Sequence, residues 1–363
     1  MGRSGDPAIL LVAAVLVAGA AVCNAQLKVG FYSKSCPTAE STVASAVRQF
    51  ADADSTILPA LVRLQFHDCF VKGCDGSVLI KGGGSNKAAE VDNNKHQGLR
   101  GLDVVDSIKQ QLEAECPGVV SCADIVVLAS RDAIAFTGGP SFDVPTGRRD
   151  GKTSSLRDAD VLPDVKDSID VLRSKFAANG LDDKDLVLLS CNHTSSSSSS
   201  CCIIDHSGEL NHGRRRRTLI AAAHTVGTTA CFFLQDRLYN FPLPGGGRGA
   251  DPTIPEGFLS ELQSRCAPGD FNTRLPLDRG SEGEFDTSIL RNIRNGFAVI
   301  ASDAALYNAT ATVGVVDTYS SMLSTFFGPY FRQDFADAMV KMGSIGVLTG
   351  GAGEVRKVCS KFN

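Results

Sequence analysis

One stretch of the chain, residues 63–77, restricts the possible folds more than any other. It begins Arg-Leu-Gln-Phe-His-Asp-Cys-Phe and continues through a short turn that holds a second cysteine. Arg63 and His67 are four residues apart, so both side chains project from one face of a helix. A guanidinium and an imidazole directed at one point suit a site where a proton is removed and negative charge then develops. The stretch therefore predicts a helix that carries a catalytic pair.

The same stretch ends in an oxygen-rich loop. Hard cations such as Ca²⁺ are bound by carboxylate, hydroxyl and carbonyl oxygens, and the loop contains all three kinds. Cys69 and Cys74 would close a short ring around it. We therefore expect a calcium site directly after the catalytic helix. The expected ligands are the side chains of Asp68, Asp75 and Ser77 and the carbonyls of Val71 and Gly73.

The N-terminus indicates an exported protein. Residues 8–22 form an apolar run that follows Arg3 and precedes small side chains. Such a run is short for a bilayer about 30 Å thick and has the outline of a signal peptide. We expect residues 1–25 to be removed, so that the mature chain begins at Gln26; a signal anchor is the alternative. Export permits disulfides, which accounts for the unusual total of twelve cysteines.

The rest of the chain has mostly helical periodicity, and strand-like alternation is scarce. The pattern predicts a helix over 38–54 and a second one, capped by Ser55, that runs through His67. Further helices are expected over 125–136 behind a capping box of Ser121 and Asp124, over 165–178, from Asp182, and over 330–342. The net charge of −4 gives no basic excess for nucleic-acid binding.

Residues 191–221 interrupt this helical pattern. They contain six consecutive serines, a Cys-Cys pair and four consecutive arginines, and the composition changes abruptly at both edges. We interpret them as translated non-coding sequence, from a retained intron or a misplaced exon boundary. One alternative is a genuine surface loop. The other is a metal-binding insert that would use the zinc-type ligands Cys191, His193, Cys201, Cys202, His206 and His212.

Outside that segment, the chain resembles the secreted haem peroxidases of plants, class III. The stretch 63–77 matches the family, as do Gly138–Asp150, Ala222–Gly227 and Val340–Gly350. The resemblance extends from Gln26 to Asn363 and excludes residues 191–221, which the family pattern lacks. It implies an all-α haem peroxidase fold, with about ten or more helices in two lobes around the haem.

The resemblance also implies a role for each matching residue. His67 is the distal base, Arg63 is the distal cation, and Phe66 lies beside them over the haem. His224 is the proximal iron ligand, and Asp303 accepts the hydrogen bond of its ring N–H. Pro163 matches a proline near the exposed haem edge, where aromatic donors dock. A second, proximal calcium site would use Thr225, Asp278, Ser281, Glu284 and Asp286.

Eight cysteines remain outside the leader and residues 191–221, and the residues alone do not choose among their pairings. The resemblance implies four disulfides: Cys36–Cys116, Cys69–Cys74, Cys122–Cys359 and Cys231–Cys266.

One distal position departs from the family pattern. The family has an asparagine six residues after the glutamate that corresponds to Glu90, and its side-chain oxygen accepts a hydrogen bond from the distal histidine. Here that position is His96. A histidine can accept the bond only as one of its two neutral tautomers. Asn93 or Asn94 would replace the asparagine if the loop shifted its register.

The function implied is reduction of H₂O₂ to water with one-electron oxidation of phenolic donors, using one haem b bound through His224 and two Ca²⁺ ions. We expect a monomer whose partners are H₂O₂ and small phenols, with no nucleic acid and no membrane once the leader is cleaved. Asn308 is a glycosylation acceptor. The chain ends four residues after Cys359, which favours the apoplast or cell wall over the vacuole. The alternative is a catalytically impaired secreted protein, stabilised by calcium and disulfides, because residues 191–221 would disrupt the helix of His224.

Overall fold

A computed structural model describes residues 26–82, 88–190, 227–282, 285–321 and 329–363. The expected leader and the segment 191–221 lie outside the described residues. So do His224, Thr225 and Glu284, three of the residues to which the resemblance assigns a role.

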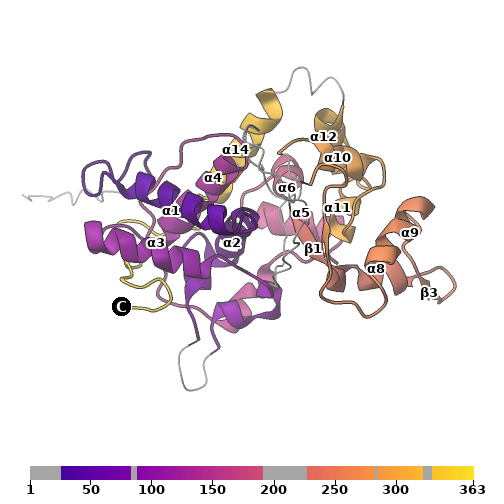
Figure 1. The fold of residues 1–363 in the computed structure, drawn as a ribbon, viewed down its shortest axis with the longest axis horizontal. Coiled ribbons are helices and arrows are strands. Elements are labelled where there is room, and N and C mark those ends of the chain that lie inside the picture. The colour runs from indigo at the N-terminus through magenta and orange to yellow at the C-terminus, as the bar shows by residue number, and fades with distance from the viewer. Residues whose placement is uncertain (1–25, 83–87, 191–226, 283–284, 322–328) are drawn as a thin grey trace, which may run out of the picture.

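Helices dominate the described part of the chain (Figure 1). The α-helices are α1 (Ala39–Ala53), α2 (Ile57–Lys72), α3 (Leu102–Glu115), α4 (Cys122–Phe136), α5 (Ile169–Ala178), α6 (Asp183–Ser190), α8 (Gln235–Tyr239), α9 (Glu256–Arg265), α10 (Ser288–Arg294), α11 (Ala301–Ala305), α12 (Thr310–Ser320) and α14 (Pro329–Met342). Short 3₁₀ helices cover Ser77–Leu79, Glu90–Asp92, Asn94–His96, Leu156–Val161 and Cys231–Leu234. The expected all-α fold is therefore confirmed.

The described strands are few and short. Strand β1 (Thr228–Ala230) pairs antiparallel with β4 (Arg274–Pro276), so that Thr229 lies opposite Leu275. Strand β2 (Phe241–Pro242) pairs antiparallel with β3 (Arg248–Gly249). The second pair lies at the start of the segment 242–255, whose proline and glycine content indicates a loop.

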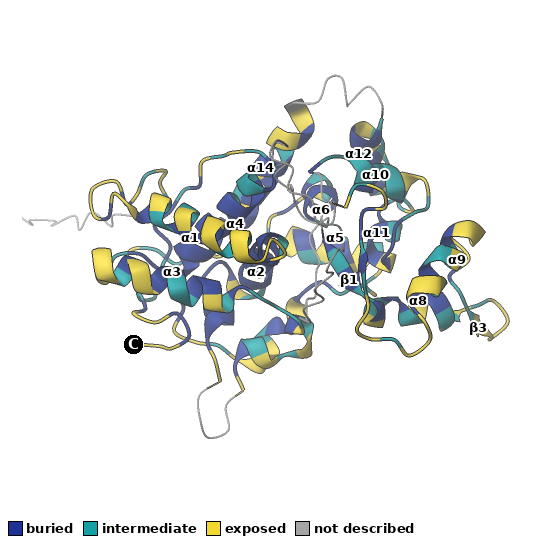
Figure 2. Ribbon diagram, in the orientation of Figure 1, coloured by how far each residue is buried: buried dark blue, intermediate teal, exposed yellow. Residues whose placement is uncertain are grey.

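Helix α2 is the central element of the N-terminal half. It packs against α4 and α1, and nearly every residue from Ile57 to Phe70 is buried (Figure 2). Apolar residues lie on every side of α2, and such a helix has to be inside the protein. Its polar residues are therefore held in a packed environment, which suits a site that needs fixed geometry.

A close backbone contact ends α2. Gly73 follows the helix with φ = 98°, and a Cβ atom there would lie 2.6 Å from the Cα of Gly346. Only glycine combines that backbone angle with that approach. The amide of Cys74 then donates to the carbonyl of Ile345 at 2.9 Å. The oxygen-rich loop is thus fixed to the chain segment that follows α14.

Two of the expected helix starts are wrong. Thr56, not Ser55, precedes α2, and its hydroxyl donates to Asp54 instead of capping the helix. Helix α5 begins at Ile169, not 165, because residues 164–167 form a turn of their own in which the Asp164 amide donates to the Asp167 carboxylate. The cap of α4 is where the sequence predicts it: Ser121 is the N-cap, its hydroxyl accepts from the Asp124 amide at 3.1 Å, and the helix begins at Cys122.

All four implied disulfides are present: Cys36–Cys116, Cys69–Cys74, Cys122–Cys359 and Cys231–Cys266. The Cys122–Cys359 bond joins the start of α4 to the C-terminal segment, which returns beside the N-terminal helices (Figure 1).

Two hydrophobic clusters make up the core. The larger one includes α1 to α6 and reaches α10, α12 and α14. The smaller one surrounds the Cys231–Cys266 disulfide and includes Leu238, Leu262 and Ile300. Among the described residues, no helix combines the length and the apolar character needed to cross a bilayer.

Candidate active site

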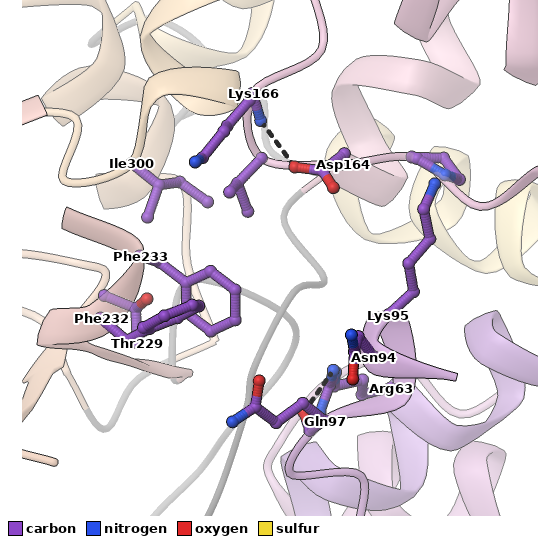
Figure 3. Close-up of a pocket in the computed structure, with 12 residues that line it drawn as sticks. Arg63, Asn94, Lys95, Gln97, Asp164, Lys166, Thr229, Phe232, Phe233 and Ile300 are labelled. Carbon is purple, nitrogen blue, oxygen red and sulfur yellow. Dashed lines mark hydrogen bonds between the residues drawn. The ribbon is translucent and has the colours of Figure 1, made fainter. Parts of the chain in front are cut away.

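A cavity of about 410 Å³ lies where the two clusters face each other (Figure 3). Arg63 of α2 and the segment 94–97 form one wall. The segment 163–166, the segment from Thr229 to Phe233, and Ile300 complete it. The cavity therefore collects residues from five separate parts of the chain, and it includes two that the sequence singled out, Arg63 and Pro163.

Arg63 is a buried cation on this wall, only 4% exposed. One of its nitrogens, Nη2, donates to the Gln97 carbonyl at 3.3 Å, while Nε and Nη1 have no hydrogen-bond partner among the described residues. Burial and then the charge of Arg274 lower the pKa of Arg63 to about 9, so it stays charged at neutral pH. Buried donors in native proteins are nearly always satisfied, so these two indicate a ligand in the cavity.

His67 lies one turn after Arg63 on the same helix and is 2% exposed. The ring of Phe66 meets the His67 ring edge to face, with 5.6 Å between the centroids. Phe66 also lines a smaller neighbouring cavity with Pro163 and Ser302. Helix α2 thus brings the three predicted distal residues together, and Pro163 lies at both cavities.

His96 occupies the position beside the distal histidine. Its Nδ1 lies 2.9 Å from Nδ1 of His67, and its Nε2 lies 3.5 Å from Oε1 of Glu90. The alternative with a shifted register is wrong. The side-chain amide of Asn93 instead donates to the Leu156 carbonyl at 2.7 Å, and Asn94 lines the large cavity.

The oxygen-rich loop has the charge imbalance that a cation would relieve. Asp68 is fully buried; its Oδ2 accepts from the Gly76 amide at 3.0 Å, and its Oδ1 has no hydrogen-bond partner among the described residues. Burial, followed by the negative charges of Asp75 and Glu90, raises the pKa of Asp68 well above its usual value. A bound cation would offset this repulsion.

The donor set of the loop fits Ca²⁺. No group of three or more His, Cys, Asp or Glu side chains among the described residues is arranged to hold a metal ion, so a cation here would be held by two carboxylates with hydroxyl and carbonyl oxygens. That is the set of ligands Ca²⁺ accepts. Asp75 is held by the Ser77 amide, which donates to its Oδ1 at 2.9 Å, and the Cys69–Cys74 disulfide closes the loop.

Comparison with known proteins decides the family. The sequence profile of the peroxidase family, described as "Peroxidase", matches residues 43–211 and 215–322. The chain belongs to this family. It is 50% identical over 340 residues to Peroxidase 43 of Arabidopsis thaliana, which covers 93% of both chains. It is 46% identical to Peroxidase 25 of Arabidopsis thaliana over 98% of this chain and 97% of that one, and 42% identical to Peroxidase N1 of Nicotiana tabacum over 93% and 90%. The resemblance to the class III plant peroxidases is confirmed, and the protein is a peroxidase.

The distal cavity fits the haem that this family uses. It combines a volume of about 410 Å³ with a buried guanidinium on one wall, two of whose nitrogens have no hydrogen-bond partner among the described residues. His224 itself lies outside the described residues. The chain re-enters the described part at Gly227, whose carbonyl accepts from the Leu277 amide at 2.9 Å, and Thr229 lines the cavity two residues later.

The structure describes four of the residues that the resemblance places on the proximal side: Asp278, Ser281, Asp286 and Asp303. Asp303 is buried in α11, directly after Ser302, which lines the smaller cavity. The Ser281 hydroxyl donates to Oδ2 of Asp286 at 2.8 Å, whereas Oδ1 of Asp278 accepts from the side-chain amide of Asn292 at 2.6 Å. The structure thus brings Ser281 and Asp286 together, and their use as calcium ligands stays a prediction.

Glu90 is the site residue that our sequence reasoning did not assign to the site. It served there only as the reference point for locating His96. It is completely buried, and its Oε1 lies 3.5 Å from Nε2 of His96. A glutamate in a polar loop gives no local signal of burial; the only signal available was its spacing of six residues from His96.

Proposed function

We propose that this peroxidase reduces H₂O₂ to water beside Arg63 and His67, on one haem b, and takes the electrons from small phenolic donors. The observation that carries the proposal is the buried Arg63, with two unsatisfied donors on the wall of a 410 Å³ cavity and His67 one turn further along α2. When bound, the haem supplies the redox centre that passes oxidising equivalents from the peroxide to the donors.

The side chains of the protein would transfer the protons and stabilise the charge that develops. His67 accepts a proton from one oxygen of H₂O₂ and returns it to the departing oxygen, first as general base and then as general acid. Arg63 stabilises the negative charge that develops as the O–O bond breaks, and this stabilisation is strongest in a cavity with little water. Two phenols each give one electron and one proton, so one H₂O₂ becomes two molecules of water. His224 would hold the iron, and Asp303 would accept its ring N–H.

We place the donor site at the cavity mouth, around Pro163, because this residue lines both cavities. Replacing Pro163 with arginine is expected to raise KM for a small phenol such as guaiacol by about tenfold, as loss of about 1.4 kcal/mol of donor contact would give. The rate of reaction with H₂O₂ should stay unchanged, because Arg63 and His67 are untouched. Steady-state kinetics with each substrate varied in turn separates the two effects.

Val161→Arg is the matched control, because Val161 is exposed and lies two residues away, outside both cavities. It should leave both parameters as in the parent enzyme. Equal KM values in the Pro163→Arg variant and the parent would place the donor site elsewhere.

We also propose two bound Ca²⁺ ions, one in the loop of Asp68 and Asp75 and one at the set that includes Ser281 and Asp286. Elemental analysis of the purified enzyme is then expected to give about two calcium ions per chain, and Asp75→Asn about one, because that loop would lose a charged ligand. Asp52→Asn removes an exposed carboxylate of α1 and should keep both ions. An unchanged calcium content in Asp75→Asn would contradict the distal site.

We infer export to the apoplast or cell wall from the leader-like N-terminus and the four disulfides, and a monomeric enzyme from the family resemblance. Disulfides persist in oxidising compartments, which supports this location. The physiological roles that fit a wall peroxidase with phenolic donors are lignification, suberisation, wall cross-linking and the response to oxidative stress. The mature domain would span residues 26–363, with residues 191–221 as an atypical insert.

A further inference from the structure

Three buried polar side chains form a row behind the cavity. They are His67 of α2, His96 at the end of a 3₁₀ turn, and Glu90 at the start of the preceding one. Their exposed fractions are 2%, 3% and 0%. The His67 and His96 rings meet through their Nδ1 atoms at 2.9 Å, and Nε2 of His96 lies 3.5 Å from Oε1 of Glu90. The row is therefore shielded from bulk solvent.

The chemistry of the three groups orders the protons. Two facing Nδ1 atoms form a hydrogen bond only if one carries hydrogen and the other carries a lone pair. An ionised Glu90 can only accept a hydrogen bond, so Nε2 of His96 then carries the hydrogen that points to it. A neutral His96 then has a lone pair on Nδ1. The hydrogen between the rings must therefore belong to Nδ1 of His67, which leaves the lone pair of His67 on Nε2.

Other contacts hold Glu90 and His96 in place. The Glu90 amide donates to Oγ of Ser154 at 3.0 Å, and Oε1 of its carboxylate lies 3.5 Å from Nε2 of His96. Burial raises the pKa of Glu90, and the interactions of its carboxylate with His96 and Ser77 oppose part of that rise. The backbone of His96 is fixed on both sides, because its amide donates to the Asn93 carbonyl and its carbonyl accepts from the Leu99 amide, each at 2.9 Å.

We propose that His96 is a positioning residue: it accepts the Nδ1 hydrogen of His67 and donates its own Nε2 hydrogen to Glu90, so that the base nitrogen of His67 is Nε2. The inference rests on the proposed function in taking His67 as the proton acceptor. An imidazole here has two tautomers, unlike an amide, whose oxygen always accepts. Glu90 is therefore required to select the productive tautomer of His96.

Neutron diffraction from a deuterium-exchanged crystal of the resting holoenzyme tests the proton order directly. We expect deuterium on Nδ1 of His67 and on Nε2 of His96, with none on Nε2 of His67. Deuterium on Nε2 of His67, or on Nδ1 of His96, would overturn the inference. This readout needs no turnover, so it separates the positioning of His67 from the proposed function. If the protons lie as predicted in an enzyme that does not react with H₂O₂, the proposed function is wrong and the positioning of His67 still holds.

Two variants at the same position give the kinetic test. His96→Leu removes the acceptor and should slow the reaction with H₂O₂ by about 100-fold, because a histidine base without its orienting partner loses most of its activity. His96→Asn restores an acceptor oxygen toward His67 and an N–H donor toward Glu90, and should recover the rate to within about threefold. If both variants are slowed equally, or neither is, His96 contributes only packing.

Discussion

Replacing His67 with leucine is expected to slow the reaction with H₂O₂ by about 100- to 10,000-fold, which is the usual contribution of a positioned acid–base group. His67 is buried one turn from Arg63, so leucine removes the acid–base group that lies beside the cation. Leucine has a similar size and fits an apolar helix, so the fold should persist. Stopped-flow absorbance in the haem Soret region measures the rate.

Haem content provides the internal control for that variant. His67 does not ligate the iron in the proposed arrangement, so His67→Leu should bind one haem per chain, as the parent does. Arg63→Leu should also bind haem and lose rate, because the charge that stabilises the departing oxygen is gone. A His67→Leu enzyme that reacts within about tenfold of the parent rate would show that another residue is the base.

Removing the Cys122–Cys359 disulfide by alanine at both positions is expected to lower the free energy of unfolding by about 5 kcal/mol. The two cysteines are 237 residues apart, and both are fully buried. A cross-link over so long a segment restricts the unfolded chain strongly, and losing it stabilises the unfolded state. Unfolding in guanidinium chloride, followed by far-ultraviolet circular dichroism at saturating haem and calcium, gives the value.

The Cys69–Cys74 disulfide is the matched comparison, because it closes a ring with a separation of only five residues. Alanine at both of its positions should cost about 2 kcal/mol by the same entropy argument. Equal losses in the two double variants would mean that the long disulfide acts through native packing and not through the unfolded chain.

The parts of the site that the sequence predicted are those encoded locally. The spacing of Arg63 and His67 requires a helix that places both on one face, and α2 does so. The disulfides followed from the family resemblance, because eight cysteines alone leave the pairing open. All four were confirmed.

The errors arose where distant residues decide local structure. In the predicted capping box of α4, the Asp124 carboxylate would accept a hydrogen bond from the backbone N–H of Ser121. Instead that carboxylate accepts from the Tyr32 hydroxyl at 2.6 Å, the Gly147 amide at 2.7 Å and Nη1 of Arg148 at 2.7 Å. No local pattern reveals such partners. The row of His67, His96 and Glu90 was not predictable for the same reason. The spacing in the sequence links Glu90 to His96, but it does not show that either residue lies beside α2.

The central claim is that the described body of this chain is a working haem peroxidase despite residues 191–221. The most direct measurement adds one equivalent of H₂O₂ to the haem-loaded full chain and to a variant that lacks 191–221, follows the Soret absorbance, and then adds guaiacol. We predict that both proteins bind one haem, that the absorbance changes within milliseconds, and that two equivalents of guaiacol restore it. Failure of both proteins to bind haem, or an absorbance that H₂O₂ does not change in either, would contradict the account.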